Sequence, residues 1–408
     1  MTSDEKGVLR ELAKKWIELA SLPVMDERKR QWAALKDLKA EKPMVLVETL
    51  YIENYVHQEE IKCADPFLRS VESQMRFKIR HAEEVGDDLV VEPIFRINWD
   101  MRFTGNGFHM NKKTSVDHRG MSHAYVYENP IKRAEDVQLY KKSVRTVDRE
   151  STQKKKVLLE EAFGDFLPVS IHGAAMFGPA ITKELLYLLG MEQMMLWKYD
   201  EPKALQTLIQ YIHQERKDTL EWYEKEGLLG LNNNSGHAGS GSPGFTTCLP
   251  AKDHHGTVRS KDMWSWVESQ ETVQISPEDF EETYLLYLAD IGNRFGLVYY
   301  GCCEPVHDRW DRIIRHIPNI RAVSISPWCD RHIMGEKLGK NIVFSAKPFP
   351  SYISGGTPEW LAMENDVKDI LKAARNCNLE FIFRDLIDIE GDRKRLSEWV
   401  SMTRKMIG

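Results

Sequence analysis

The first forty residues carry apolar side chains at a helical period. One face of the predicted helix collects the residues Leu9, Leu12, Ala13, Trp16, Ile17 and Ala20. Pro23 closes this segment, and a second, charged helix is expected from Asp26 to Leu38. Residues 1–42 are therefore predicted to form an N-terminal helical extension.

From Pro43 onward, short apolar runs alternate with helical patterns. Pro43–Glu48 is a continuous apolar run of the kind that a parallel sheet buries on both faces. Further strands are expected at 90–95, 167–171, 228–231, 297–300, 322–325, 342–345 and 381–383, with helices at 181–189, 202–226 and 276–294. Such alternation predicts a parallel sheet with right-handed crossovers.

The number of expected strands suits a closed barrel. The prediction is an α/β fold, a (β/α)8 TIM barrel over residues 43–408 with long loops at the carboxyl-terminal face of its strands. An open doubly wound sheet is the alternative, and it is less favoured because no glycine-rich phosphate turn follows the first strand.

Length, charge and cysteine usage narrow the function classes. The 408 residues suit one elaborated barrel, since such barrels run from about 250 residues to beyond 400. The net charge is −6 without a long basic block, so neither nucleic acid nor an anionic membrane is an expected partner. The chain lacks a signal-peptide pattern and any apolar run near the roughly 18 residues of a membrane span. Six scattered cysteines indicate reduced thiols in a cytoplasm.

Working residues of a barrel lie where its strands end, because the loops there converge on one mouth. This rule selects a set of polar candidates: Glu48, Tyr51, Arg96, Asn98, Asp100, His172, Asn232, Asn233, Asn234, His237, Cys302, Cys303, Glu304, Ser326, Trp328, Cys329, Asp330, Lys347, Arg384 and Asp385.

The stretch 299–308 suggests a metal site. Side chains alternate along a strand, so Cys302 and Glu304 are expected to share a face while Cys303 points away, and Pro305 is expected to begin a helix. A thiolate and a carboxylate, with Cys329 as third ligand, would suit zinc with an open position. The alternative is that the cysteines are small buried fillers.

Several other candidate residues each have more than one interpretation. His172 is a general acid or base, a metal ligand or a hydrogen-bonded core histidine. The glycine-rich stretch 232–245 is a binding lid or a solvated loop, and Trp264 with Trp266 forms an aromatic wall or packs in the core. Adjacency places Arg384 and Asp385 on opposite faces, so the two are not expected to pair.

The order of these blocks resembles the uroporphyrinogen decarboxylase superfamily. The similarity is carried by the segments 169–179, 189–190, 200–202, 275–280, 300–304 and 382–399. The resemblance implies a barrel with a deep cleft and one of three chemistries: porphyrinogen decarboxylation, corrinoid-dependent methyl transfer or zinc-assisted thiol alkylation. Family members are often dimers, so a homodimer is expected.

Two departures from the family pattern favour the methyl-donor branch. The stretch Glu48–Tyr55 lacks the arginine-rich motif of porphyrinogen decarboxylases, and Tyr300-Gly301-Cys302 lacks the histidine of the thiol-alkylating enzymes. The chain is therefore similar to enzymes that move a methyl group from a small methoxy or methylamine compound to a corrinoid (cobalamin) on a partner protein.

This interpretation assigns roles to the candidates. The acid that protonates the leaving group would be Glu48, His172, Asp330 or Asp385. The substrate pocket would be formed by Tyr51, Arg96, Asn98, Asn232, Asn234, His237, Trp264, Trp328, Lys347 and Arg384, and the zinc ligands would be Cys302, Glu304 and Cys329. A decarboxylase or lyase, holding another carboxylic acid at Arg96 or Arg384, is the alternative enzyme. A non-catalytic binding barrel is the third class.

Overall fold

The computed structural model describes residues 1–116 and 122–408 of the chain. It begins with the two expected helices, α1 (Ser3–Ala20) and α2 (Pro23–Lys36). Thr2 and Glu5 form a capping box that satisfies free N–H groups at the start of α1. Arg10 of α1 pairs with Asp165, and the Trp16 indole donates to the carbonyl of Glu92, so α1 is packed onto the rest of the fold.

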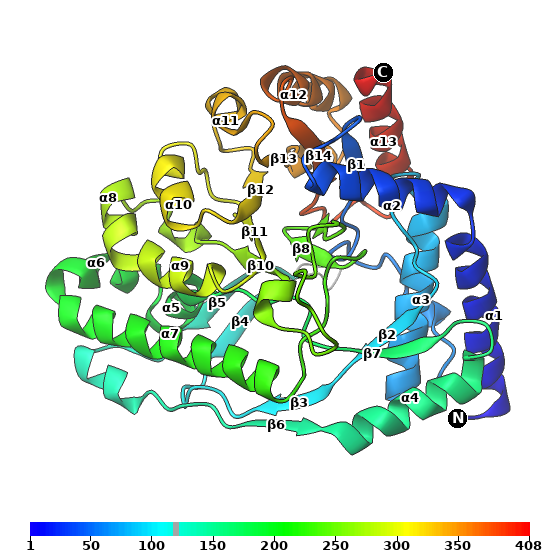
Figure 1. Ribbon diagram of the computed structural model, residues 1–408, viewed down its shortest axis with the longest axis horizontal. Coiled ribbons are helices and arrows are strands. Elements are labelled where there is room, and N and C mark those ends of the chain that lie inside the picture. Colours follow the sequence, from blue (N-terminus) through cyan, green and yellow to red (C-terminus); the bar gives the residue numbers. More distant parts are fainter. Residues whose placement is uncertain (117–121) are drawn as a thin grey trace.

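A six-stranded parallel sheet dominates the fold (Figure 1). Its strands in spatial order are β1 (Met44–Val47), β14 (Asn378–Phe383), β13 (Val343–Ala346), β12 (Ile320–Ile325), β11 (Leu297–Tyr300) and β10 (Trp264–Val267). The helices between and after them are α8 (Pro277–Phe280), α9 (Leu286–Gly292), α10 (Trp310–His316), α11 (Arg331–Leu338), α12 (Trp360–Ala373) and α13 (Lys394–Ile407). This arrangement confirms the predicted α/β class.

A second parallel pair, β2 (Phe95–Asn98) with β7 (Val169–His172), lies beside this sheet. Single contacts join the two: Asp88 donates its backbone N–H to the carbonyl of Val45, and Trp266 donates to the carbonyl of Phe177. The predicted strand at 228–231 contributes one bridge, between Ala174 and Leu229. In the described part of the chain, the hydrogen-bonded ladders thus form sheets of six and two parallel strands and no continuous ring of eight.

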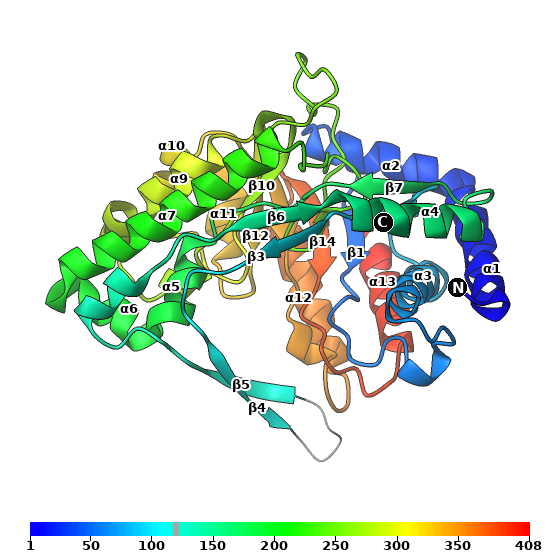
Figure 2. The ribbon, with the colours of Figure 1, turned by 90° about the horizontal axis from the view of Figure 1, so that it is seen from below.

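The polar excursion after β2 forms two antiparallel pairs, β3 (Asp100–Phe103) with β6 (Arg145–Asp148) and β4 (Asn111–Val116) with β5 (Ser122–Glu128). The remaining long helices are α3 (Pro66–Glu84), α4 (Arg149–Phe163), α5 (Ile181–Leu189), α6 (Met191–Asp200) and α7 (Pro202–Lys225). Seen from below, α2 lies at the top and the β4–β5 hairpin projects from the opposite side (Figure 2).

Two apolar layers lie on the two faces of the sheet. Residues such as Phe381 and Phe383 of β14 face one layer, which they share with the helices that follow the strands. Ile382 of the same strand faces the other layer, which includes α1, α2, α3 and α4. The alternation along β14 shows that both faces of the sheet are buried, as the continuous apolar runs of the sequence predict.

The glycine-rich stretch after residue 232 enters the concave face of the sheet. It forms a hairpin of β8 (His237–Gly239) and β9 (Ser242–Pro243), drawn near the centre of Figure 1. Gly239 lies against the ring of Tyr299, where an added Cβ would come within 2.5 Å of a ring carbon. Gly241 has φ +80°, and an added Cβ would meet Ile382 and Glu48. The small residues are needed because the hairpin fills the space between the strands.

Three element predictions are wrong in position or type. The strand predicted at 90–95 begins only at Phe95, and 264–267, predicted as aromatic wall or core helix, is strand β10. Pro305 does not begin a helix, because turns continue to α10 at Trp310. The strands at 44–47, 297–300 and 343–346 lie where they were predicted.

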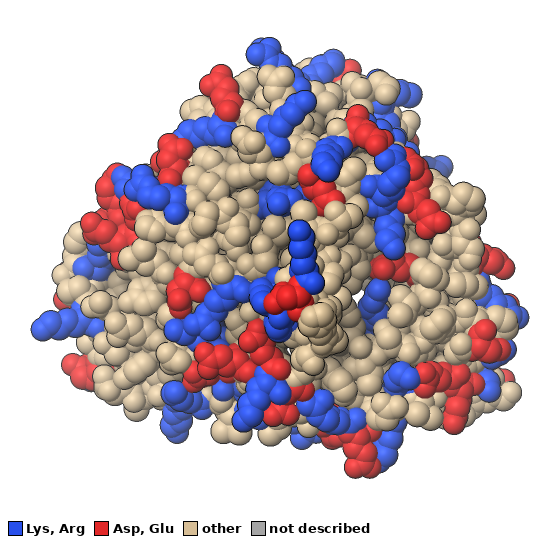
Figure 3. Space-filling view, in the orientation of Figure 1, with Lys and Arg blue, Asp and Glu red and all other residues tan. Residues whose placement is uncertain are grey.

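No helix among the described residues combines the length and apolar character that crossing a bilayer requires. On the face shown in Figure 3, basic and acidic side chains are interspersed. All six cysteines are free thiols.

Candidate active site at the strand ends

The ends of β1 and β14 carry a buried ion pair. The backbone N–H of Glu48 donates to the carbonyl of Phe383 at 2.7 Å, which aligns the two strand ends. Nε of Arg384 then lies 3.1 Å from Oε2 of Glu48, and both side chains are almost fully buried. Burial raises the pKa of Glu48, although the charge of Arg384 opposes the shift. Glu48 is thereby less acidic than an exposed glutamate, while Arg384 still favours its charged form.

Arg384 also contacts groups on two other segments and its own neighbour Asp385. Its Nη1 donates to Oγ of Ser240 at 2.5 Å and to Sγ of Cys302 at 3.6 Å, and Nε lies 3.4 Å from Oδ1 of Asp385. The prediction that Arg384 and Asp385 do not pair is wrong. Asp385 has φ +61°, so the chain has left the extended conformation and side-chain alternation no longer applies.

Tyr51 and His237 border this ion pair on the solvent side. Tyr51 is 53% exposed, and burial of its hydroxyl together with the nearby Glu48 raises its pKa. Nδ1 of His237 lies 3.7 Å from Oε1 of Glu48. Burial and the positive charge of Lys78 lower the pKa of His237 to about 4. The imidazole is therefore neutral at pH 7.

Cys302 and Cys303 follow β11 and adjoin each other, with their sulfur atoms 3.7 Å apart. Cys303 is exposed, and its Sγ lies 4.0 Å from Oδ2 of Asp385. The contact with Cys303 and then burial raise the pKa of Cys302, whereas the contact with Cys302 lowers the pKa of Cys303. The exposed thiol is the one that ionises more readily.

Glu304 does not share a face with Cys302, contrary to the prediction from strand alternation. The strand ends at Tyr300, and Gly301 at φ +90° begins a turn. The carboxylate of Glu304 is fully buried and accepts the backbone N–H groups of Ser269 and Cys302, both at 2.9 Å. Its position is explained by these loop contacts.

Glu268, directly after β10, was not among the predicted residues. Its side chain is almost fully buried. Burial, followed by the neighbouring charges of Glu271, Glu304 and Cys302, raises its pKa to about 9. Glu268 therefore holds a proton at pH 7 at the carboxyl end of the sheet, beside the turn that bears Cys302.

The three residues after β12 form a separate group. Sγ of Cys329 lies 3.7 Å from Nδ1 of His307, and burial raises the pKa of that thiol to about 11. Asp330 is exposed and caps α11, where its Oδ1 accepts the N–H of Ile333 at 3.0 Å. Trp328 is 69% exposed and packs edge-on against Phe349. None of these contacts joins the group to Glu48 or Arg384.

The predicted zinc ligands do not form one ligand set. Cys302 contacts Arg384, Glu304 is held by two backbone N–H groups, and Cys329 contacts His307. Across the described residues, no group of three or more His, Cys, Asp or Glu side chains is placed to hold a metal ion. The donor set therefore does not fit zinc.

The ends of β2 and β7 bring together a second predicted group. Arg96 forms two hydrogen bonds with the carboxylate of Glu92, at 3.0 and 3.1 Å. Burial and the charge of Arg96 lower the pKa of His172. Asn98 is the strand-register partner of His172 and is exposed. Arg96 is therefore already neutralised by a carboxylate of its own chain.

Lys347 lies deeper, inside the sheet. Its Nζ donates to Oη of Tyr299 at 3.0 Å and to Oγ of Ser345 at 2.9 Å. Burial lowers its pKa to about 7, against the opposing effect of Glu380. Glu380 in turn forms a fully buried ion pair with Lys36 of α2, at 2.6 Å. Lys347 therefore belongs to this buried network and not to the strand-end ion pair.

Three residues that were predicted to bind substrate instead donate hydrogen bonds to backbone carbonyls of the fold. Nδ2 of Asn232 donates to the carbonyls of Ala175 and Trp264, and Nδ2 of Asn234 donates to that of Leu231. Trp264 is fully buried, with its indole N–H on the carbonyl of Gly244. These residues hold the hairpin segment against β10.

Sequence reasoning missed Glu268, Ser240, Lys36 and Glu380. Glu268 had a usable signal, since it ends the apolar run 264–267, and the strand-end rule would have selected it had that run been identified as a strand. Ser240 had none, because its contact with Arg384 spans 144 positions of sequence.

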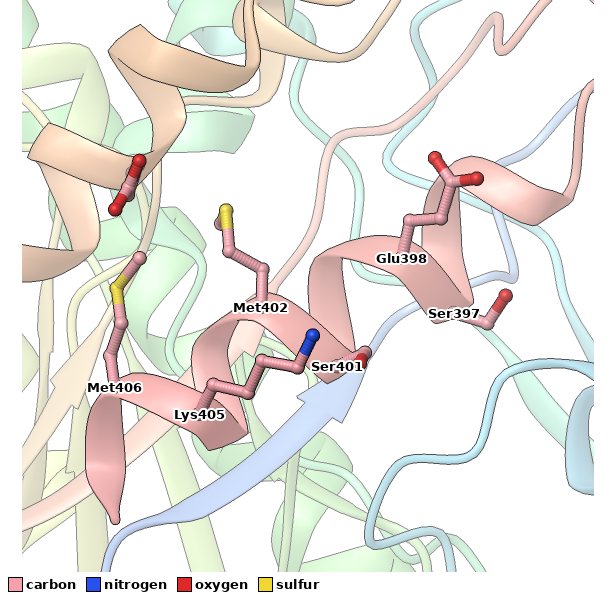
Figure 4. A pocket seen from close by; sticks show the side chains of 7 residues that line it. Ser397, Glu398, Ser401, Met402, Lys405 and Met406 are labelled. Carbon is pink, nitrogen blue, oxygen red and sulfur yellow. The ribbon is translucent and has the colours of Figure 1, made fainter.

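A hollow of about 650 Å³ lies elsewhere, along the outer face of α13 (Figure 4). It is lined by Glu364, Ser397, Glu398, Ser401, Met402, Lys405 and Met406. These side chains belong to helices α12 and α13 and include no strand-end residue, so this hollow is not part of the candidate site.

Comparison with known proteins gives little further constraint. No protein-family model matches the sequence, and no curated protein matches it either. One similar solved structure is a methyltransferase from Methanosarcina mazei, at 11% identity and a TM-score of 0.37, with 62% of each chain covered. The chain thus spans less than two thirds of that protein's length. At this TM-score the likeness supports no assignment of function, which must come from the site itself.

Proposed function

We propose that this chain is an enzyme that transfers a methyl group from a small methoxy or methylamine compound to the corrinoid of a partner protein. The proposal rests on the family resemblance of the sequence and on the strand-end site. The observation that carries it is Glu268, a buried acid directly after β10 whose pKa is raised to about 9. We also propose that the sheets of six and two strands are parts of one distorted barrel.

Demethylation of an ether or amine needs an acid near the leaving atom. Protonating the leaving oxygen or nitrogen as its bond to carbon breaks avoids the release of a strong base, and a positioned acid contributes about 10²- to 10⁴-fold to such steps. Glu268 retains its proton up to a pH of about 9, because its pKa is raised to about that value. Glu48 adjoins the half-buried His237 and the exposed Tyr51, so it lies nearer to solvent-accessible groups.

The alternative, a decarboxylase or lyase, is less well supported by the charges. It would need a free cation to hold the carboxylate of its substrate. Arg384 already faces Glu48 and Asp385, and Arg96 is bound by both oxygens of Glu92. A substrate carboxylate would have to displace these partners, which makes anion binding at either arginine unfavourable.

A direct assay tests the proposal with chemically reduced cob(I)alamin as acceptor and a panel of methoxy and methylamine compounds. Formation of methylcobalamin is followed by its absorbance, with wild type, Glu48→Gln and Glu268→Gln compared at pH 7. We expect turnover with at least one donor and a rate lower by about 10²-fold in at least one of the two variants.

Glu398→Gln is the matched control, because Glu398 is an exposed carboxylate on α13 outside the site. Its rate should equal that of wild type. Release of carbon dioxide from a carboxylic acid, without methyl transfer from any donor, would overturn the proposal in favour of the lyase.

A further inference from the structure

A second cavity lies outside the strand-end site, between α7, the start of α5 and the β3–β6 pair. Its volume is about 450 Å³, within the range of small-molecule sites. The residues that bear on its chemistry are Tyr140, Met176, Phe177, Glu184, Arg216 and Tyr223. Three of the six are aromatic, one is a cation and one is an acid.

Arg216 is the unusual group in this cavity. Its guanidinium carbon lies 5.2 Å from the centre of the Phe177 ring, and Nη2 donates to the carbonyl of Gly178 at 2.7 Å. Nε is buried and has no hydrogen-bond partner. Arg216 makes no ion pair within the part of the chain that the structure describes. Burial lowers its pKa, as expected when a charge lacks close compensation.

Two acids line the cavity, Glu184 and Glu215, and neither forms an ion pair with Arg216. Oε1 of Glu184 accepts a hydrogen bond from Nδ2 of Asn106 at 2.5 Å. Burial raises the pKa of Glu184, so the fold favours its uncharged form. The carboxylate of Glu215 is paired with Arg145. Arg216 is therefore left without a direct anionic partner among the acids of the cavity.

Aromatic rings define the shape of the remaining space. Phe177 packs edge-on against Tyr223, with ring centres 6.1 Å apart, and Tyr140 stacks on Tyr211 outside the cavity. Burial raises the pKa of both cavity tyrosines, which keeps their hydroxyls neutral. Met176 is 54% exposed, so it lies where solvent reaches the cavity.

We propose that this cavity is a binding site for a small aromatic carboxylic acid. The carboxylate would accept hydrogen bonds from Nη–H groups of Arg216 other than the one on Gly178, a charge-assisted contact that arginine forms well with carboxylates. The ring of the ligand would pack among Tyr140, Phe177 and Tyr223. This occupant supplies the negative charge that Arg216 lacks within the described part of the chain.

The cavity contacts the strand that leads to Glu268, but it shares no lining residue with the strand-end site. The carbonyl of Phe177 accepts the N–H of Trp266 and Oγ–H of Ser265, both at 3.0 Å. Both donors belong to β10, which ends immediately before Glu268. The proposed site is therefore distinct from the reacting groups, and its ligand need not be the substrate.

Calorimetric titration of the full chain with phenylacetate tests this inference without any assay of activity. We expect saturable binding of one equivalent, and binding at least tenfold weaker for neutral phenylacetamide and for the aliphatic acid octanoate. Arg216→Gln should weaken phenylacetate binding at least tenfold. Arg294→Gln, at a partly exposed arginine outside the cavity, should leave it unchanged.

Met176→Trp guards against misfolding of the Arg216 variant, because it narrows the cavity from its exposed side. It should also abolish binding while the thermal unfolding midpoint stays near that of wild type. Absence of saturable binding to wild type, equal affinity for the amide, tighter binding of octanoate, or unchanged affinity in both variants would each overturn the proposal.

Discussion

Glu380 lies within β14 and Arg384 directly follows that strand, and the two side chains are in different environments. Glu380 is fully buried and is paired with Lys36 of α2, while the neighbouring Lys347 adds a second cation. Arg384, four residues later, is paired with Glu48 and lies beside the exposed Asp385, which in turn contacts the exposed Cys303. Both clusters pair a basic side chain with a glutamate, at different depths in the fold.

The difference in depth distinguishes a cluster that stabilises the fold from a cluster that is placed to react. The Lys36–Glu380 cluster is closed by Ser242 of the hairpin, whose Oγ lies 2.6 Å from Nζ of Lys36, so solvent has no access. Charges held in this way can select one packing of α2 against the sheet, but they cannot meet a substrate. The strand-end cluster has buried acids beside exposed side chains, which is the arrangement that proton transfer requires.

The largest effect is expected from breaking the inner cluster. Lys36→Met leaves the Glu380 carboxylate buried without its cation, which should lower the free energy of unfolding by about 3–5 kcal/mol. Urea denaturation followed by circular dichroism measures this loss. Lys36→Met combined with Glu380→Gln removes both charges, and most of the stability should return. A double variant as unstable as the single one would show that the pair is not the source of the effect.

The next effect concerns the outer cluster and its pH dependence. Because the pKa of Glu268 is about 9, the acid is protonated below that pH, and the rate should fall as the pH rises through 9. Glu268→Gln should lower the rate at pH 7 by about 10²-fold and remove this alkaline decline. The measurement is the pH profile of methylcobalamin formation.

Stability provides an independent check on Glu268. Folding raises the pKa of this acid, so its contribution to stability is complete below about 4.5 and is lost as the pH rises through about 9. Glu268→Gln should therefore unfold with less pH dependence across that window. An unchanged profile would mean that Glu268 ionises normally in the folded protein.

The smallest effect is expected at Asp330, which the sequence suggested as a catalytic acid. Asp330→Ala removes the N-cap of α11 and should cost about 1 kcal/mol of stability. The rate of methyl transfer should stay at the wild-type value, because Asp330 contacts neither Glu48 nor Arg384. Thermal unfolding and the cobalamin assay together test this. A large loss of rate would show that Asp330 takes part in the reaction.

Much of the fold was predictable because it depends on local patterns. The apolar runs at 44–47 and 297–300 and the long helix α7 appear where periodicity places them. Strand β10 was missed because Trp264, Ser265 and Trp266 read as readily as a core helix or an aromatic wall. The single bridge at Leu229, where a full strand was predicted, depends on the partner segment around Ala174, which no local pattern reveals.

The site was predictable as a set of positions but not as a set of contacts. The strand-end rule selected Glu48, Arg384 and Cys302, and the structure places Glu48 and Cys302 in contact with Arg384. It could not show that Arg384 pairs with Asp385, since that contact depends on the left-handed backbone of Asp385. Nor could it show that the carboxylate of Glu304 accepts the backbone N–H of Ser269. Because this contact occupies Glu304, the zinc prediction is left without support.

The sequence by itself determined the α/β class, the order of its strands along the chain and the polar residues at their carboxyl ends, because each follows from spacing along a few consecutive residues. The tertiary structure alone decided which of those residues meet, which are neutralised and which keep a proton. The physical reason is that pKa, ion pairing and access to solvent depend on neighbours brought from distant segments, such as Ser240 at Arg384 and Lys36 at Glu380.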